Sequence, residues 1–291
     1  MNVLSLFDGM SCGQIALDQL GIKVDNYYAA EIDKYAIEIA KKNYPNTIHL
    51  GDVTKIKSED LPQIDLLIGG SPCQGFSFAG KQLNFNDPRS ALFFEFVRLL
   101  KETKPKYFLL ENVRMKKEFQ DIITEHLGWI EPIRINSALV SAQNRERLYW
   151  SNIPNKTQPR DKGLLLKDIL NGEKDELIYR EPYYVRYEKE DGCIGYVGKQ
   201  PKQATRVYST NGKSQCLTAL GGGQGGKTGL YEIPNTKTCR KPTPEECEKL
   251  QTVPVGYTEG VSNTQRYKML GNGWTVEVIK HIFKNMEISN G

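Results

Sequence analysis

The stretch VLSLFDGMSCG, residues 3–13, decides the fold class of this 291-residue chain. Its first five residues, Val3–Phe7, form a short apolar run typical of a buried strand, and a glycine-bearing turn follows at once. A helical pattern then continues through Leu20 and stops at Gly21. A strand, a glycine turn and a helix in this order favour an α/β domain built on a parallel sheet.

The same alternation continues through the first 150 residues. Further buried strands are expected at Tyr27–Ala30, Asp65–Gly70 and Tyr107–Glu111, and helices at Tyr35–Ala40 and Ala91–Leu100. Parallel strands that alternate with helices imply a sheet covered on both faces.

The second half of the chain has a different texture from about Pro154 onward. Prolines, tyrosines and glycines become more frequent, and Arg206–Tyr208 and Gln215–Thr218 have the character of strands joined by glycine turns. Helical periodicity returns at Thr275–Phe283, so we expect the chain to return to the first domain. We therefore predict a larger domain of residues 1–171 and 265–291 and a smaller, mostly β domain of residues 172–264.

The composition is that of a globular protein, with 39% hydrophobic and 25% charged residues, which excludes disordered and fibrous classes. No stretch is apolar enough for a membrane helix, so we expect a cytoplasmic protein with no membrane partner. The six cysteines include no C-x-x-C pair and the three histidines lie far apart. No metal site and no disulfide framework are therefore expected.

The net charge of +4 hides a concentrated basic strip. The window Lys199–Lys241 holds eight basic residues and a single acid, Glu232, for a net charge of +7, which leaves −3 for the remainder. Such a strip is of the kind that neutralises nucleic-acid phosphates. A solvated loop has the same charge pattern, and charge alone does not separate the two interpretations.

The first glycine turn is a candidate site for a nucleotide-like ligand. Gly9 and Gly13 place backbone N–H groups and a helix N-terminus at the carboxyl edge of the sheet. Glu31 lies 22 residues beyond Gly9, where a carboxylate can accept both ribose hydroxyls, and Asp52 can accept an adenine amino proton. The alternative is a helix-start turn with two surface acids.

A second glycine-rich segment, Gly221–Thr228, matches the phosphate-binding pattern G-x-x-x-x-G-K-[ST]. That pattern must open a helix, and here Gly229 and Pro234 follow, so we do not expect an ATP site. A glycine ribbon that approaches DNA closely, with Lys227 on a phosphate, is the better interpretation.

Cys73 lies just beyond a predicted strand, on the glycine-flanked loop Gly69–Ser77. Such a placement suits a nucleophile, although a lone cysteine is more often a small buried hydrophobe. Glu111 ends the next strand at the same edge of the sheet. An acid at the end of an apolar strand is costly without a task, with structural ion pairing as the alternative.

Two arginines, Arg145 and Arg147, alternate along the probable strand Gln143–Trp150. Alternation places both on one face of the strand. Two guanidinium groups aimed together favour an anion or a base carbonyl as their ligand.

An ordered set of short motifs resembles the DNA (cytosine-5) methyltransferase family over nearly the whole chain. The set is Phe7-Asp8-Gly9, Pro72-Cys73-Gln74, Glu111-Asn112-Val113, Gln143-x-Arg145-x-Arg147 and Gly271-Asn272-Gly273. The first domain resembles the Dnmt3 branch, notably at Phe7-Asp8-Gly9 and Trp150–Pro154. The second domain is similar to HhaI-type bacterial enzymes at Val197–Lys199, Arg206–Thr210, Gly221–Gly223 and Lys227–Gly229.

The resemblance implies a Rossmann-like S-adenosylmethionine (SAM)-dependent methyltransferase domain with a mixed, mainly parallel sheet, and a smaller, mostly β target recognition domain. It makes Cys73 the nucleophile that adds to carbon 6 of cytosine, because carbon 5 alone attacks a methyl sulfonium poorly. Glu111 would supply a proton at N3, Arg147 would hold the base carbonyl or a phosphate, and Arg145 would support it. No dedicated base for the carbon-5 proton is found, so an ordered water is expected.

The family pattern also assigns residues to the methyl donor SAM. The methionine end maps to Phe7, Asp8, Gly9, Met10 and Ser11, the ribose to Glu31, adenine stacking to Ile32, and the adenine edge to Asp52 and Val53. Closing contacts map to Pro72, Leu92, Asn272, Gly273 and Trp274. Ile32 is aliphatic where an aromatic residue often stacks, and Met10-Ser11-Cys12 replaces a second glycine.

Double-stranded DNA is the implied partner, with the target cytosine flipped out of the helix. Gln203 would insert into the stack, Arg206 would read a guanine edge, and the loop Gly75–Asp87 would close over the base. The remaining residues that the resemblance places at DNA are Gln74, Ser77, Lys81, Leu220, Gly223 and Lys227. The HhaI pattern has an aromatic residue at the position of Leu220.

The leading hypothesis is a sequence-specific DNA cytosine-5 methyltransferase that acts as a monomer. Its partner would be a restriction system or, for a phage enzyme, the genome of the host. A tRNA-methylating enzyme of the same fold and a catalytically silent DNA-binding regulator are the alternatives. The glycine-rich second domain argues against the first, and the presence of both Cys73 and Glu111 against the second. The target sequence and the bacterial or phage origin stay open.

Overall fold

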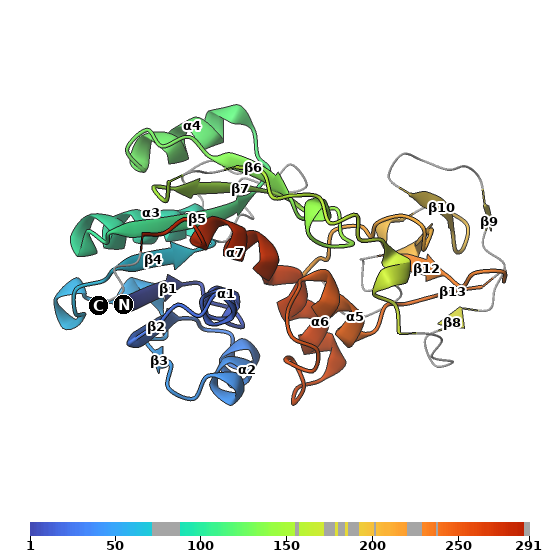
Figure 1. The fold of residues 1–291 in the computed structure, drawn as a ribbon, viewed down its shortest axis with the longest axis horizontal. Coiled ribbons are helices and arrows are strands. Elements are labelled where there is room, and N and C mark those ends of the chain that lie inside the picture. Colours follow the sequence, from blue (N-terminus) through green and yellow to red (C-terminus); the bar gives the residue numbers. More distant parts are fainter. Residues whose placement is uncertain are drawn as a thin grey trace. The chain divides into compact units, whose positions relative to one another are not determined.

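The computed structural model describes residues 1–71, 88–154, 157–171, 178–179, 184–185, 192–200, 202–219, 229–236 and 238–287. The chain divides into two compact units, whose elements are labelled in Figure 1. The first unit comprises residues 1–135, 146–158 and 279–291, and the second comprises residues 136–145 and 159–278. The last segment of the chain, residues 279–291, thus belongs to the first unit, whereas residues 265–278 belong to the second.

A seven-stranded sheet forms the centre of the first unit. Its order is β3 (Ile48–His49), β2 (Asn26–Ala30), β1 (Asn2–Leu6), β4 (Leu66–Gly69), β5 (Tyr107–Val113), β7 (Glu146–Ser151) and β6 (Ile133–Asn136). The pairs β2–β3, β1–β2, β1–β4 and β4–β5 are parallel, whereas β5–β7 is antiparallel. The sheet is therefore mixed and mainly parallel, as expected.

The parallel strands β1, β2 and β4 end at the same height, so the residues that follow them lie close together. Leu6, the last residue of β1, is in register with Ala30 of β2 and Gly69 of β4. Gly69 allows the helix α3 (Pro88–Thr103) to approach the sheet closely, since a Cβ there would lie 3.0 Å from the Phe96 ring. The residues that follow these strands therefore share one edge of the sheet.

Five of the described helices belong wholly or partly to the first unit, and some of them contribute apolar side chains to its main core cluster. They are α1 (Cys12–Gln19), α2 (Lys34–Asn43), α3, α4 (Lys117–His126) and α7 (Val276–Phe283). Asp33 caps α2 by accepting hydrogen bonds from the amides of Tyr35 and Ala36. Phe93 and Phe96 of α3 are fully buried in the main core cluster. The sequence analysis did not anticipate α4.

The second unit contains a smaller sheet of six short strands. Its order is β8 (Ile178–Tyr179), β13 (Cys239–Arg240), β12 (Leu230–Glu232), β11 (Arg206–Tyr208), β10 (Cys193–Tyr196) and β9 (Tyr184–Val185). The strand predicted at Arg206–Tyr208 is confirmed, and its Val207 packs with Ile194 and Leu230. Two helices of this unit, α5 (Pro244–Leu250) and α6 (Asn263–Asn272), were not predicted.

The strand predicted at Gln215–Thr218 is wrong. Ser214 forms only an isolated bridge with Gln143, and the following residues lie in no sheet. Side chains replace the missing strand partner, because the Leu217 amide donates to Gln143 Oε1 at 2.8 Å and the Leu217 carbonyl accepts from Arg145 at 3.1 Å. Strand-like composition predicts an extended backbone here but not the identity of its partners.

Candidate active site

Three of the predicted site segments follow three adjacent strands of the first unit. Phe7–Ser11 follows β1, Glu31 and Ile32 follow β2, and Asp52 and Val53 come after β3. Since these strands are parallel neighbours, the segments gather at the carboxyl edge of the sheet.

The turn after β1 has an unusual backbone that Glu31 organises. Phe7, Gly9 and Ser11 have φ angles of +57°, +59° and +65°, in the left-handed region. Glu31 Oε2 accepts a hydrogen bond from the Gly9 amide at 2.8 Å, and Oε1 accepts from the Ile32 amide at 2.7 Å. The carboxylate predicted to bind a ribose thus also holds the turn in shape.

Asp8 supports the same turn from inside. Its carboxylate accepts hydrogen bonds from the hydroxyls of Ser5, Ser11 and Tyr27. The side chain of Met10 is buried as well, at 1% exposure. Asp8 and Ser11 bond each other and Met10 packs in the core, so the mapping of these residues to the methionine end of the donor stays a prediction that rests on their backbone.

Asp8 should make the stability of the fold depend on pH. Burial raises the pKa of its carboxyl to about 6, against hydrogen bonds from Ser11, Ser5 and Tyr27 that lower it. The folded state therefore holds this proton more tightly than the unfolded state, so Asp8 adds stability as the pH falls through about 6 toward 3.8. In Asp8→Asn this gain should disappear.

Urea unfolding of both proteins at about pH 7.5 and about pH 5 checks this expectation. The free energy of unfolding should change more favourably on acidification in the parent than in the variant. Asp25→Asn is the control, since a hydrogen bond from the amino terminus holds the pKa of the Asp25 carboxyl below its usual value. Equal pH responses of the parent and Asp8→Asn would refute the assignment.

Residues suited to an adenine ring lie along this edge. Ile32 is a large apolar side chain that is 77% exposed. Asp52 accepts through Oδ1 from the Thr54 amide at 3.0 Å, and this hydrogen bond holds the pKa of its carboxyl below the usual value. Within the described residues no donor reaches Asp52 Oδ2. Ile32 and Asp52 come after the neighbouring strands β2 and β3, and the adenine contacts assigned to them stay a prediction. Val53 and Leu92 pack with the core cluster.

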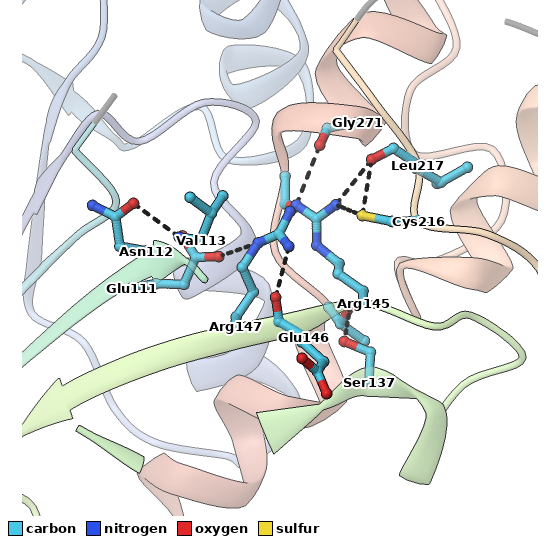
Figure 2. A network of polar contacts seen from close by, with 12 residues as sticks. Glu111, Asn112, Val113, Ser137, Arg145, Glu146, Arg147, Cys216, Leu217 and Gly271 are labelled. Carbon is cyan, nitrogen blue, oxygen red and sulfur yellow. Dashed lines mark hydrogen bonds and ion pairs between the residues drawn. The ribbon is translucent and has the colours of Figure 1, made fainter. Parts of the chain in front are cut away.

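Glu111 and Arg147 form an ion pair across β5 and β7, as Figure 2 shows. Arg147 Nε lies 3.0 Å from Glu111 Oε1, and the two side chains are 14% and 10% exposed. Arg147 also donates through Nη1 to the Glu146 carbonyl at 2.8 Å. The carboxylate and the guanidinium therefore stand at one place, largely shielded from water, and the pair strengthens there because little solvent screens it.

Asn112 connects this pair to the loop that carries Cys73, a link that the sequence analysis missed. Asn112 Nδ2 donates to Ser71 Oγ at 3.3 Å, and both residues are buried. Its Oδ1 accepts from the Val113 amide at 2.8 Å. Ser71 follows β4 and precedes Cys73 by two positions, so the start of the loop is fixed beside the strand that bears Glu111.

Arg145 does not join Arg147 in presenting a pair of cations. β7 begins at Glu146, so Arg145 lies outside the strand. Its guanidinium donates to Leu217 O at 3.1 Å, Gly271 O at 3.2 Å and Gly273 O at 2.8 Å, as Figure 2 shows in part. The expectation that both arginines aim at one ligand is wrong, because the guanidinium of Arg145 is committed to backbone carbonyls.

Several predicted site residues lie outside the described residues: Pro72, Cys73, Gln74, Ser77, Lys81, Leu220, Gly223 and Lys227, with the loop 75–87 and the segment 221–228. Gln203 begins a short 3-10 helix, Gln203–Thr205. Asn272 ends α6, and Gly273 and Trp274 follow it in the second unit.

The basic strip is only partly available to a ligand. Lys213 donates to three backbone carbonyls, Arg240 pairs with Glu246 at 2.7 Å, and Lys241 lies over the Tyr267 ring. Arg206 differs, because its half-buried guanidinium has no hydrogen bond or ion pair among the described residues. The sequence count of +7 therefore overstates the charge that this strip can offer to phosphates.

Two further observations concern the described residues only. They contain no cluster of three or more side chains that could hold a metal ion. No helix among them is both long and apolar enough to cross a membrane.

Comparison with known proteins gives one family over nearly the whole chain. A family model described as C-5 cytosine-specific DNA methylase matches residues 1–288. The type II methyltransferase M.HhaI of Haemophilus parahaemolyticus is 32% identical, over 98% of this chain and 94% of that protein. The type II methyltransferase M1.ScrFI of Lactococcus lactis is 34% identical, over 98% of this chain and 77% of that protein.

Solved structures with a similar fold include the methyltransferase EhMeth of Entamoeba histolytica, with a TM-score of 0.75 at 20% identity over 98% of this chain and 97% of that one. A DNMT2 variant of Spodoptera frugiperda has a TM-score of 0.71 at 22% identity, over 97% of this chain and 98% of that one. At these identities the likeness concerns the fold. It confirms the α/β methyltransferase fold with a second, smaller sheet.

Proposed function

This chain belongs to the C-5 cytosine-specific DNA methylase family, and from that premise we propose that it methylates cytosines within one defined sequence of duplex DNA through a covalent adduct on Cys73. It is a DNA (cytosine-5) methyltransferase, and its family uses SAM. The donor supplies an electrophilic methyl group, so the chain's own residues must make carbon 5 of cytosine nucleophilic.

Residues at the carboxyl edge of the first sheet would hold the donor. Glu31 would bind the ribose hydroxyls while it keeps the Gly9 amide in place. The exposed Ile32 would cover the adenine ring, and Asp52 Oδ2 would accept from the adenine amino group beside Val53. The backbone of Phe7–Ser11, rather than its inward side chains, would meet the methionine end. Pro72, Leu92 and Asn272–Trp274 would complete the donor site.

The observation that carries the proposal is the Glu111–Arg147 pair beside the anchored start of the Cys73 loop. The pair lies 3.0 Å apart between two strands, and the Ser71–Asn112 hydrogen bond joins the neighbouring loop to the same strand. An acid and a cation held together can balance the charge that develops when a nucleophile adds to a pyrimidine, and Cys73 follows the anchored Ser71 by two positions in the sequence.

Cys73 would act first, as a thiolate. Its sulfur forms a bond to carbon 6 of the cytosine, and the electron pair of the 5,6 double bond moves toward carbon 5. Carbon 5 would then take the methyl group as the bond between that group and the sulfonium sulfur of the donor breaks, so that S-adenosylhomocysteine leaves. Loss of the carbon-5 proton to an ordered water and cleavage of the sulfur–carbon bond restore the aromatic ring and the thiolate.

Glu111 would provide the proton that makes this addition favourable. The acid form of Glu111 donates to N3 as negative charge reaches the ring, and it recovers the proton when Cys73 leaves. Glu111 Oε1 faces Arg147 Nε at 3.0 Å, and the entering base would place its N3 at the same carboxyl group. Arg147 would then hold the base carbonyl or the adjacent phosphate.

Residues 172–264 would read the DNA sequence, and residues 1–171 and 265–291 would carry out the chemistry. Gln203 would fill the gap left by the flipped cytosine. Lys199 and Lys202 are exposed and suit contacts with phosphates. Arg206 suits a base edge, because it lies at the start of β11 and its guanidinium has no partner among the residues that the structure describes. Gln74, Ser77, Lys81, Leu220, Gly223 and Lys227 would complete the DNA contacts.

Arg206→Ala should weaken discrimination at one base pair of the target by about 1–3 kcal/mol, because a bidentate contact with guanine is lost. Competition binding with single-base variants of the target duplex measures this. Lys199→Ala is the matched control and should lower affinity for all sequences alike. An unchanged site preference in Arg206→Ala would remove this residue from recognition.

We also propose a biological setting for the protein, which its similarity to known methyltransferases supports. The type II methyltransferases it resembles favour a role in restriction-modification, or in protection of a phage genome, and a monomer in the bacterial cytoplasm, where the genome lies. The finer likeness of the first domain to the Dnmt3 branch is not supported by the matches, which favour HhaI-type bacterial enzymes.

Bisulfite sequencing of genomic DNA from cells that express the protein tests the proposal. We expect 5-methylcytosine at one position of one short sequence, absent from cells without the protein. Purified protein with labelled SAM should transfer methyl groups to duplex DNA and not to tRNA. Transfer to tRNA alone would favour the tRNA-methylating alternative, and DNA binding without any transfer would favour the silent regulator.

A further inference from the structure

A buried cluster of polar side chains lies within the second unit. This polar core consists of Ser137, Gln143, Arg145, Gln251 and Thr275, all at most 3% exposed. Its members bond one another: Gln143 Nε2 donates to Gln251 Oε1 at 3.3 Å, and Thr275 Oγ1 donates to the same oxygen at 2.8 Å. Such a network fixes its surroundings when every member is satisfied.

Arg145 is the charged member of the polar core, and it is held without an acid. Among the described residues no carboxylate forms a salt bridge with it, and its hydrogen bonds go to carbonyls and to Cys216 Sγ at 3.3 Å. Arg240, equally buried at 3%, instead pairs with Glu246 through bonds of 2.7 and 2.8 Å. A buried cation without a counter-charge is a poor source of stability, so its value lies in what it connects.

Two segments far apart in the chain meet at the polar core. The turn Gly271–Gly273 accepts two hydrogen bonds from Arg145 and one from Gln251 Nε2, at 3.1 Å to Gly273 O. The segment Cys216–Ala219 accepts from Arg145 at Leu217 O, while the Leu217 amide donates to Gln143. Figure 2 shows Arg145 between Gly271 and Leu217.

The same two segments also touch directly, backbone to backbone. A Cβ on Gly271 would lie 2.1 Å from the Thr218 carbonyl oxygen and 2.6 Å from the Ala219 amide nitrogen. Only glycine permits this approach, since real side chains do not tolerate such distances. A displacement of the turn must therefore displace Thr218 and Ala219 as well.

We infer that Arg145 is a positioning residue that joins the Gly271–Gly273 turn to the Cys216–Ala219 segment, so that methyl donor and DNA strengthen each other's binding. The inference rests on the proposed function, which assigns Asn272–Trp274 to the donor and the residues directly after Ala219 to DNA. When one ligand orders its own segment, the second segment is ordered with it, so the second ligand loses less free energy in ordering that segment when it binds. Thermodynamic linkage makes the effect reciprocal.

The test compares Arg145→Lys with Arg240→Lys as the matched control. Lysine keeps the charge in both but cannot span two segments as a guanidinium does. The dissociation constant for a duplex carrying the methylated sequence is measured with and without S-adenosylhomocysteine, beside KM for SAM and kcat. In the parent we expect the ligand to tighten DNA binding at least about 5-fold.

In Arg145→Lys, the factor by which S-adenosylhomocysteine tightens DNA binding should fall toward 1. KM for SAM should rise by about 10-fold, with a smaller effect on kcat. Arg240→Lys should lose thermal stability but keep the factor and the KM of the parent. Gly271→Ala, which alters the contact without touching a charge, should repeat the Arg145→Lys result and decides the matter if Arg145→Lys does not fold.

Three results would overturn the inference: a parent without coupling, an Arg145→Lys protein that keeps it, or an Arg240→Lys protein that loses it equally. The proposed function fails on a different result, the absence of methylated cytosine in bisulfite sequencing. The coupling itself can then still be measured, on genomic DNA fragments, because it needs binding and not turnover.

Discussion

Replacement of Cys73 by serine is expected to abolish methyl transfer, with a loss of about 10⁴- to 10⁶-fold in kcat, the range found when a nucleophile is removed from a concerted group. A serine hydroxyl ionises far less readily than a thiol, so the addition to carbon 6 fails. The affinity for SAM should stay near normal, because Glu31, Ile32 and Asp52 follow other strands. Single-turnover transfer and calorimetric titration of SAM measure the two properties.

Cys193→Ser is the matched control for this prediction. The Cys193 thiol is 5% exposed and donates to Gly195 O at 3.6 Å, a bond that a hydroxyl can also make. It should retain full activity. Turnover within tenfold of the parent in Cys73→Ser would take this residue out of the nucleophile's role.

The second large effect is expected at Glu111. Glu111→Gln keeps the shape of the side chain and an oxygen that can accept from Arg147, but it cannot release a proton to N3. We expect kcat to fall by about 10²- to 10⁴-fold, the usual contribution of a general acid. Rapid-quench measurement of the first turnover, with DNA and SAM saturating, isolates this step.

Glu146→Gln provides the comparison for Glu111→Gln. It makes the same chemical change on β7, where the carboxylate is 38% exposed and 3.5 Å from Arg114, and it should leave kcat unchanged. If Glu111→Gln retained half of the parent rate and a normal melting temperature, Glu111 would be only the structural partner of Arg147.

The first half of the fold could be predicted because each element carries its own signal. The runs at Val3–Phe7, Asp65–Gly70 and Tyr107–Glu111 are apolar on both faces, which is the pattern of a central parallel strand. The observed β1, β4 and β5 match them within two residues at each end. Helix α4 is amphipathic, so its periodicity carried a usable signal, although no helix was predicted at Lys117–His126.

The failures in the second unit have a common physical cause. The backbone at Leu217 is held by Gln143 and Arg145, and no neighbouring strand among the described residues pairs with it. These long polar side chains come from a segment about 70 positions earlier in the chain. Local sequence reports backbone preference, whereas the partner of a backbone amide is a long-range property.

The predictions for the two arginines and for the basic strip were wrong for a related reason. The alternation of Arg145 and Arg147 along a predicted strand placed them on one face of it, but the strand begins only at Glu146. The charge count assigned Lys213 and Arg240 to a ligand. In the structure Lys213 donates to backbone carbonyls and Arg240 pairs with Glu246. A cation's sequence position therefore does not indicate whether the fold has already engaged it.

The residues of the candidate site show the reverse pattern. Glu31 and Asp52 were found from their place after the first glycine turn, and Glu111 because an acid at the end of an apolar run is costly. Asn112 was not found, although it stands beside Glu111, because its importance depends on the Ser71 hydroxyl across the strand pair. A side chain that positions another residue has no recognisable sequence pattern, because its role depends on a partner that is distant in the chain.

The covalent role of Cys73 is the central claim, and one measurement tests it directly. A target duplex with 5-fluorocytosine at the methylated position cannot lose a proton from carbon 5, so the adduct should persist once the methyl group has been transferred. Mass spectrometry of the digested product is expected to find the modified cytosine on the peptide that contains Cys73, only when SAM is present. Methylation of ordinary DNA combined with no adduct, or with an adduct on another residue, would contradict the account.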